Sequence, residues 1–426
     1  MKWKLWLFAL LALAFSPALA KTKLVLASWG SQEEIAAYQK AIQAFQAKNP
    51  DLEVEYINIP SSEYLAKVTT MFAAGTAPDV FFLNNIDFPG LASRNVLQPL
   101  DDFVKQQKYD TTSFYPGLLQ AFRWDGKLYA LPRDASNLLI FYNRDLLKKA
   151  GLPDPRPNWT WDDFLRYAKA LTVEKDGKRV QWGVSFYTFY LFWEPWVWSA
   201  GGSFYNKDHT KFALNEPAAL EGLQFYLDLR YKHHVAPTPE EAQDQGGFTM
   251  FLNGKTGLIV DGRWRVPTLK AKAKFDFDVV PFPRGKAGSV VDIDGSGWVM
   301  ARSSKNPEAA WKLLSFLAGP ESSQIFTKTG LIIPARGVDV KNVEKSIQSL
   351  KDFFVYPPPK NQQFFLTVNS GARPTETFER WNEALQLINK ALEPVWQGKA
   401  ELKAALDGVA PQVQKILDEV QQARKR

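Results

Sequence analysis

The chain has 426 residues, a formal net charge of +7 and no cysteine. The lack of cysteine excludes disulfides, thiolate catalysis and thiolate metal sites, and the length exceeds one hydrophobic core and predicts two lobes. Basic residues form a block only at 424–426, which is typical of a solvated tail, so we expect no nucleic-acid partner.

The chain begins with a pattern typical of a secretory signal peptide. Lys2 and Lys4 precede an apolar run over 5–15, and two alanines follow at the positions that a signal peptidase reads. The run is about half of what spans a bilayer, so we predict a cleaved signal over 1–20. Because no cysteine is available for lipidation, we expect an untethered protein that starts at Lys21 and works in a periplasm.

Strands and helices alternate at the start of the mature chain. Apolar periodicity predicts strands over 23–28, 52–59 and 79–83, and helices over 31–48 and 63–74. This alternation indicates a parallel sheet covered by helices on both faces. In such sheets, ligands bind beyond the carboxyl ends of the strands.

The rest of the chain continues with mixed elements and an aromatic stretch over 187–198. We predict a hairpin at 124–127, strands over 128–131 and 138–142, a helix capped by Thr160, and helices over 217–231, 307–318, 376–393 and 399–423. No repeat or low-complexity linker separates these elements. We therefore expect two lobes joined by several crossing strands.

Six short motifs, in this order, resemble the extracellular solute-binding proteins of family 1, the sugar-capturing subunits of ABC importers. They are AAGTAPDV (73–80), GKLYALP (126–132), FYNRDL (141–146), WTWDDF (159–164), GKTG (254–257) and NPEAAW (306–311). Each motif is weak alone, but six at the spacing of the family are specific, and the resemblance covers the mature chain. The missing lipid-anchoring cysteine, which many relatives carry, is a departure that affects retention and not binding.

The resemblance implies an α/β, two-lobed periplasmic-binding-protein fold of type II, with a mainly parallel sheet in each lobe and a ligand cleft between the lobes. We expect an N-terminal lobe over 21–133 and 280–335 and a C-terminal lobe over 134–279 and 336–426. It also implies a monomeric protein that captures a mono- or oligosaccharide by lobe closure, delivers it to the transmembrane permease of an ABC transporter and catalyses nothing. No metal or cofactor is expected, because His209, His233 and His234 lack companion ligands at metal spacing.

Four candidate ligand-binding residues lie in the first part of the chain. Trp29 ends the first strand, where relatives have a cleft residue, although core packing would explain it equally. Glu34 matches an acidic ligand contact of the family, but Ser31-x-x-Glu34 is also a capping box. Asn84 and Asp87 follow a buried strand, where a turn or a polar sugar contact would use the same residues.

The remaining candidates begin with two residues in the segment that the family uses as a hinge. Asp134 and Ser136 lie between two apolar strands, and the charge of Asp134 needs either sugar hydroxyls or Arg133 as its partner. Of Trp193 and Trp196, we expect one to form a stacking wall and the other to belong to the core. The family pattern adds Trp264, the pair Gly297 and Trp298, and Arg373 before Pro374, an arginine that could equally be an ordinary surface residue.

Aromatic residues make up 14% of the chain, and flat rings with a polar edge suit ligands that are half apolar and half hydroxylated. The main alternative is an exported glycoside hydrolase that uses Glu216 of an Asn-Glu-Pro motif with Glu194. Asn215 has a simpler explanation as a helix N-cap, and eight strand–helix units are missing. A binding protein for a phosphorylated polyol would need clustered arginines or helix N-termini.

Overall fold

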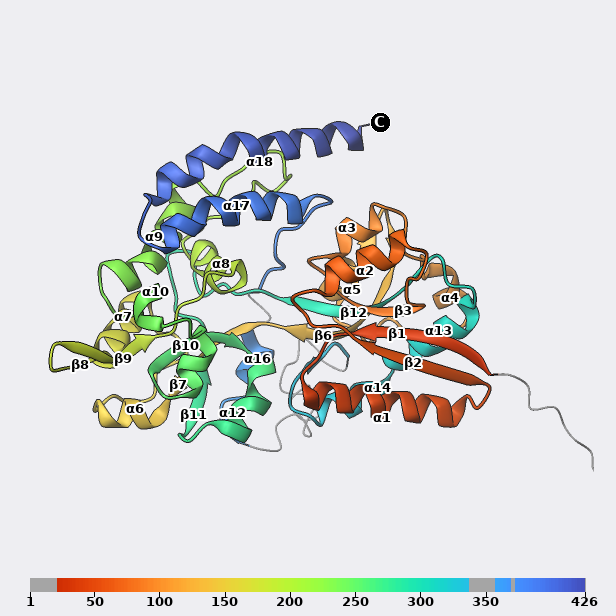
Figure 1. The fold of residues 1–426 in the computed structure, drawn as a ribbon, viewed down its shortest axis with the longest axis horizontal. Coiled ribbons are helices and arrows are strands. Elements are labelled where there is room, and N and C mark those ends of the chain that lie inside the picture. The colour runs from red at the N-terminus through yellow and green to blue at the C-terminus, as the bar shows by residue number, and fades with distance from the viewer. Residues whose placement is uncertain (1–20, 337–356, 369–371, 426) are drawn as a thin grey trace, which may run out of the picture.

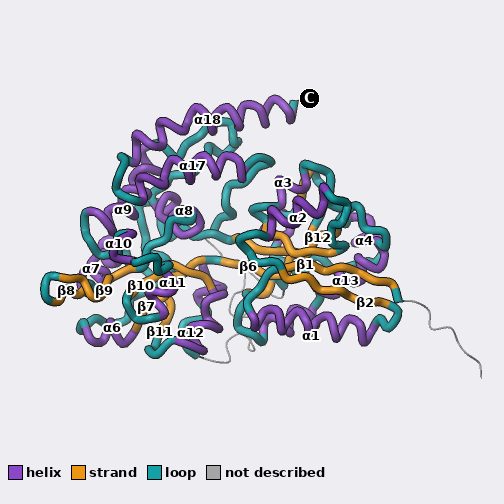
Figure 2. The backbone as a smooth tube through the Cα atoms, in the orientation of Figure 1, coloured by secondary structure: helices purple, strands orange, loops and turns teal. Residues whose placement is uncertain are grey.

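A computed structural model describes residues 21–336, 357–368 and 372–425, and it has two lobes connected by extended segments (Figure 1). The predicted signal over 1–20 lies outside the described residues. In both lobes, the strands form a central layer with helices on either side (Figure 2).

The N-terminal lobe is built on a six-stranded sheet in the order β13-β6-β12-β3-β1-β2. Its strands are β1 (Thr22–Ser28), β2 (Leu52–Asn58), β3 (Val80–Asn84), β6 (Ala130–Ser136), β12 (Asp294–Met300) and β13 (Ile333–Pro334). Its helices are α1 (Gln32–Lys48), α2 (Tyr64–Ala73), α3 (Phe88–Ala92), α4 (Asp101–Gln106), α5 (Pro116–Ala121), α13 (Pro307–Leu317) and α14 (Pro320–Thr327). The predicted hairpin joins β4 (Arg123–Trp124) to β5 (Lys127–Leu128).

The C-terminal lobe contains a five-stranded sheet in the order β11-β7-β10-β9-β8. Its strands are β7 (Leu138–Asn143), β8 (Val173–Lys175), β9 (Lys178–Val184), β10 (Thr256–Gly262) and β11 (Phe277–Val280). Its helices are α6 (Arg144–Lys149), α7 (Trp161–Ala170), α8 (Tyr190–Ser199), α9 (Pro217–Tyr231), α10 (Pro239–Ala242), α11 (Gly247–Leu252), η1 (Arg263–Arg265), α12 (Val266–Lys272), α16 (Phe364–Thr367), α17 (Trp381–Trp396) and α18 (Leu402–Arg424). Helices α17 and α18 pack together along the outside of this lobe (Figure 1).

Two hydrophobic clusters form the interior of the protein. The first fills the N-terminal lobe and continues along one face of the second sheet through Phe141, and the second fills the opposite face through Ile140 and Tyr142. Neighbouring residues of β7 thus enter different clusters, as the period of two in a strand requires. A strand buried on both faces reads as a continuous apolar run, which is why 138–142 was predictable.

Two of our expectations about the fold need correction. Both sheets are mixed rather than mainly parallel, since β12 runs antiparallel to β3 and β6, and β7 runs antiparallel to β10 and β11. The chain also returns to the first sheet at Asp294, not at 280, because Phe282 and Val291 pack in the second cluster. Apolar periodicity finds strands but carries no direction, so the mixed pairing was not visible in it.

Candidate functional site

A cavity of about 570 Å³ opens between the lobes. Its lining comes from the carboxyl ends of β1 and β3, from the segment where β6 and β12 pair, and from α8 and η1 across the gap. Seven of the twelve predicted binding residues line it: Trp29, Glu34, Asn84, Asp87, Asp134, Ser136 and Trp264.

Arg133 organises the acidic side of the cavity. Its Nη1 lies 2.7 Å from Glu34 Oε1, its Nε donates to Asp134 Oδ2 at 2.7 Å, and its guanidinium stands 4.3 Å from the ring centroid of Phe82. Burial alone would lower the pKa of Arg133, but its acidic neighbours outweigh burial and raise the pKa. The partner that Asp134 required is therefore Arg133.

A β-bulge explains how Arg133 and Asp134 come to face the same space. Ser296 pairs with Asp134 and Gly297 pairs with Pro132, so that Arg133 is the extra residue of β6. Successive side chains of a regular strand point to opposite faces, whereas a bulge re-aims one of them. Both side chains consequently line the cavity and pair with each other.

Of the two hydrogen bonds of the predicted capping box between Ser31 and Glu34, the structure contains one. Ser31 Oγ accepts a hydrogen bond from the backbone N–H of Glu34 at 3.3 Å, which caps α1. The Glu34 carboxylate, however, does not return to Ser31 and instead accepts from Arg133 and Tyr38. Its Oε2 accepts no hydrogen bond from the described residues, so this oxygen remains available to a ligand.

Several neutral polar side chains line the cavity without a partner among the residues that the structure describes. Within the described part of the chain, no side-chain hydrogen bond is made by Asn84, Ser136 or the Nε1 atoms of Trp29 and Trp264. Ser61 and Ser62 also line the cavity, and their hydroxyl groups likewise make no side-chain hydrogen bond with the described residues. These groups are neutral donors and acceptors that a hydroxylated ligand could satisfy.

Trp264 reaches the cavity from the C-terminal lobe because Gly262 leaves room for it. A Cβ atom on Gly262 would stand 2.0 Å from Cζ3 of the indole, closer than atoms can approach. Trp29, on the opposite lobe, is held by edge contacts to Tyr64 and Phe82, with ring centroids 4.6 and 4.3 Å away. The two indoles thus belong to different walls of one cavity.

Asp87 connects the lobes beside the cavity. Its Oδ1 accepts a hydrogen bond from Nδ2 of Asn382 in α17 at 3.3 Å. Burial raises the pKa of Asp87 to about 6, although this hydrogen bond opposes the shift. The carboxyl group therefore titrates near neutral pH at a contact between the two lobes.

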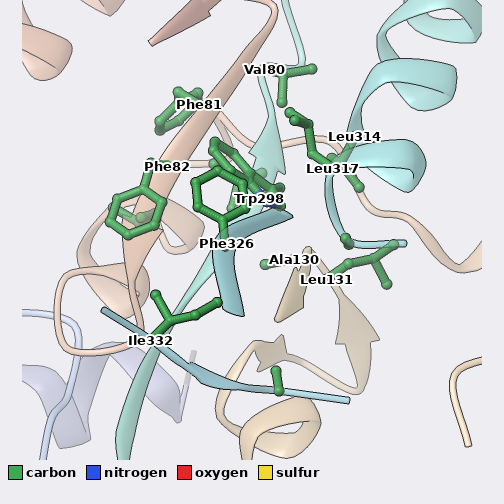
Figure 3. Packing of buried hydrophobic residues seen from close by; sticks show 14 of the residues in the cluster. Val80, Phe81, Phe82, Ala130, Leu131, Trp298, Leu314, Leu317, Phe326 and Ile332 are labelled. Atoms are coloured by element: carbon green, nitrogen blue, oxygen red, sulfur yellow. The ribbon is translucent and has the colours of Figure 1, made fainter. Parts of the chain in front are cut away.

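Three predicted tryptophans lie in the cores and not in the cavity lining. Trp298 packs against Tyr38 and Phe82, and Figure 3 shows it surrounded by apolar side chains. Trp193 stacks on Phe204, and Trp196 packs against Phe164 and Phe282. All three side chains are fully buried, so neither member of the pair Trp193 and Trp196 forms a wall.

Gly297 and Arg373 also lie outside the lining. A Cβ on Gly297 would meet the carbonyl oxygen of Leu131 at 3.0 Å, so this glycine serves the close approach of β12 to β6. The guanidinium of Arg373 pairs with Glu376, donates to Ser203 and stacks on Trp198. We leave all five residues out of the site proposed below.

The structure adds lining residues that the sequence did not single out. Phe189, Leu191 and Arg263 come from the C-terminal lobe, and Asn85, Asp294 and Ser296 come from the N-terminal lobe. Phe189 is 48% exposed, which is unusual for a large apolar side chain. The dense aromatic stretch contains it, but composition could not separate one exposed ring from its buried neighbours. Burial lowers the pKa of Arg263 to about 9, and its Nη1 donates to Gln362.

No group of three or more histidine, aspartate or glutamate side chains in the described ranges is placed to bind a metal ion. Nor does any helix within those ranges combine the length and hydropathy that crossing a membrane requires.

Two lobes joined by crossing segments, with a partly polar cavity between them, define a two-lobed solute-binding protein. The chain belongs to the bacterial extracellular solute-binding protein family, whose model matches residues 29–324. This match confirms the family and the fold class that the six motifs predicted.

Individual relatives match over most of the chain. A protein of Brucella abortus (strain 2308) named as a binding protein is 27% identical, over 98% of both chains. The galactooligosaccharide-binding protein of Bacillus subtilis is 24% identical, over 90% of this chain and 87% of its own. An ABC substrate-binding protein of Listeria monocytogenes in complex with cycloalternan is similar in structure, with 26% identity and a TM-score of 0.86 over 93% of this chain and 99% of its own.

Proposed function

We propose that this protein captures a neutral mono- or oligosaccharide by lobe closure and delivers it to the permease of an ABC importer. The observation that carries the proposal is that one wall has neutral polar groups without a partner among the described residues, while the other wall has Trp264 and Phe189. Sugars offer hydroxyl groups to the first and C–H faces to the second. Because the two walls belong to different lobes, only the closed form makes both sets of contacts, so ligand favours closure.

The relatives support a carbohydrate ligand. Of the three compared above, one is named for galactooligosaccharide binding and one holds cycloalternan, and a further relative, from Pyrococcus abyssi, is named a maltotriose-binding protein. The cavity volume of about 570 Å³ lies in the range of small-molecule sites.

A phosphorylated polyol is a poorer match to the cavity. Of the two guanidinium groups in the lining, that of Arg133 pairs with Glu34 and Asp134, and that of Arg263 donates to Gln362. An anion would also meet the carboxylates of the lining, which repel it. Neutral ligands carry no such cost.

The positions of Glu216 and Glu194, the two carboxylates that a glycoside hydrolase would use, favour binding without catalysis. Glu216 pairs with Lys211 at the protein surface, and Glu194 is fully buried in α8. Neither lines the cavity, whereas a glycosidase places both carboxyl groups beside the scissile bond. Asn215 donates to Asp407 and is not the N-cap of α9, a position that Glu216 occupies.

The proposed setting is a periplasm. The signal over 1–20 would direct export, and the absence of cysteine would leave the mature protein without a lipid anchor. In this setting we expect a monomer that meets the permease in its closed form. Mass spectrometry of the exported protein tests the cleavage site, because cleavage there leaves Lys21 as the first residue.

A thermal-shift screen tests the ligand class. Neutral sugars, from monosaccharides to maltotriose, are compared with their phosphate esters, because a ligand that binds only the folded state raises the melting temperature. We expect at least one neutral sugar to stabilise the protein and to be recovered intact after prolonged incubation. Stabilisation by phosphate esters alone would contradict the proposal, and so would a hydrolysis product that disappears in Glu216→Gln.

A further inference from the structure

Three carboxyl groups are buried where the lobes join. Glu194 lies on α8, Asp294 begins β12, and Asp292 precedes it, with exposed fractions of 0%, 7% and 0%. Across the described part of the chain, none of the three makes an ion pair, in contrast to the acids around Arg133. A buried carboxylate without a cation is costly, so such a group either gathers donors or keeps its proton.

The hydroxyl of Thr375 links two of these acids. Its Oγ1 lies 2.9 Å from Glu194 Oε1 and 2.7 Å from Asp294 Oδ2, both ordinary hydrogen-bond distances. A hydroxyl group has one hydrogen to donate, so it cannot donate fully to two carboxylates. In one of the two hydrogen bonds, the acid must therefore be protonated and donate to Thr375 Oγ1.

We infer that Glu194 is a neutral carboxylic acid, a positioning residue that donates its proton to Thr375 and so directs the Thr375 hydroxyl to Asp294. The donors around the two acids decide between them. Asp294 accepts from Nδ2 of Asn85 at 2.8 Å, from the backbone N–H of Thr375 at 3.2 Å and from the Thr375 hydroxyl, which satisfies an ionised group. Among the described residues, Glu194 forms a hydrogen bond only with the Thr375 hydroxyl, and its buried Oε2 has no partner there.

The surrounding charges favour the same assignment. The titratable groups that face Glu194 are Asp294, Asp292 and Glu376 from other elements and Tyr190 from its own helix. Burial first, and then the negative charges of these acids, raise the pKa of Glu194 well above its ordinary value. Burial also raises the pKa of Asp294, but the hydrogen bonds from Asn85 and Thr375 oppose that shift. Glu376, in turn, pairs with the guanidinium of Arg373.

The relay ends at the floor of the ligand cavity. Asp294 holds the Asn85 side chain, whose Oδ1 accepts the backbone N–H of Gly295 at 3.0 Å, and all three residues line the cavity. A proton on Glu194, in the C-terminal lobe, thus fixes polar groups that belong to the N-terminal lobe. The value of this order for sugar binding rests on the function proposed above, but the protonation itself does not.

Infrared difference spectroscopy at pH 8 tests the protonation without any sugar. We expect the wild-type protein to show the C=O band of a protonated carboxyl group, and Glu194→Gln to lose that intensity while folding normally, because an amide replaces a neutral acid. Glu216→Gln is the matched control, since this glutamate is exposed, and it should leave the band unchanged. A wild-type spectrum without the band, or a band of unchanged intensity in Glu194→Gln, would overturn the inference.

Hydrogen exchange at the Gly295 amide tests the positioning role. Thr375→Val removes the relay and should shift the carboxyl band and accelerate this exchange about tenfold, whereas Thr375→Ser should keep both at the wild-type values. Equal exchange in the Val and Ser variants would overturn the positioning role. Because neither readout involves a sugar, their failure and a failed sugar screen are separate results.

Discussion

The two lobes contribute to the cavity very unequally. The N-terminal lobe supplies all of its carboxylates and most of its polar groups, and the C-terminal lobe supplies Phe189, Leu191, Arg263 and Trp264. The first wall is fixed by buried hydrogen bonds, such as those from Ser296 to Asp134 at 3.0 and 2.5 Å. Apart from Arg263, which donates to Gln362, the second wall presents rings and an aliphatic side chain, which need no such network.

This asymmetry gives the two walls different roles, one in selecting the ligand and the other in lobe closure. A preorganised polar wall loses little entropy when ligand binds, so it selects hydroxyl positions. Rings from the other lobe add contact area only once the gap has shut. Substitutions in the polar wall should therefore lower mainly the stability of the protein, and substitutions in the aromatic wall should lower mainly its affinity for the sugar.

The largest effect is expected where the polar wall is most charged. Arg133→Met should lower the free energy of unfolding by about 3–5 kcal/mol, because it leaves Glu34 and Asp134 buried without their cation. Urea denaturation measures this loss. The matched control is Arg144→Met, whose partners Asp154 and Asp276 are 43% and 44% exposed and whose loss should cost less than about 1 kcal/mol. Equal losses in both variants would contradict the comparison.

On the aromatic wall, Trp264→Ala should weaken the sugar identified in the screen by about 2 kcal/mol, or about 30-fold. The melting temperature of the free protein should change little, because the indole is only partly buried. Calorimetric titration gives the affinity. Trp124→Ala removes a partly buried indole outside the cavity and should leave affinity unchanged. Wild-type affinity in the Trp264 variant would remove this residue from the site.

The contact between the lobes at Asp87 makes stability depend on pH. The pKa of Asp87 is about 6 in the folded protein, above its ordinary value of 3.8. The free energy of unfolding is therefore highest below about pH 4, where Asp87 is protonated in both states, and it falls as the pH rises through 6. Asp87→Asn should therefore gain about 2 kcal/mol over the wild type between pH 4 and pH 7, as urea midpoints at each pH would show. Asn382→Ala keeps the titrating group but removes the hydrogen bond that opposes the shift, so its stability should fall with pH at least as steeply as that of the wild type. A pH-independent difference for Asp87→Asn would be inconsistent with burial of the carboxyl.

The smallest effect is expected at Phe189. Because this side chain is already 48% exposed, Phe189→Ala should leave stability unchanged and weaken the sugar by about 0.5–1 kcal/mol. The measurement is the same calorimetric titration. A drop in melting temperature without a change in affinity would reassign the ring to packing of the C-terminal lobe.

Local signals predicted much of the fold. Thr160 and Asp163 form the expected capping box of α7, and Asp125 and Gly126 have the positive φ values that the hairpin signal requires. These features depend on a few adjacent residues, so the sequence displays them directly. The six motifs likewise identified the family.

The site was predictable only where a residue's position along a strand decides its environment. Asn84 and Trp29 follow strand ends and line the cavity, as expected. Trp298 lies two residues further along β12 than Ser296, which lines the cavity, and is therefore inside the core of the N-terminal lobe. How far a strand extends past the cavity edge was not visible in the sequence. Phe189 and the Thr375 relay depend on contacts between distant segments, which periodicity does not encode.

A crystal structure of the complex with the sugar found in the screen tests the central claim most directly. The account predicts the sugar between the lobes, with its hydroxyl groups on Asn84 and Ser136 and a C–H face against Trp264. A sugar bound elsewhere on the protein, with this cavity empty and the lobes apart, would contradict it.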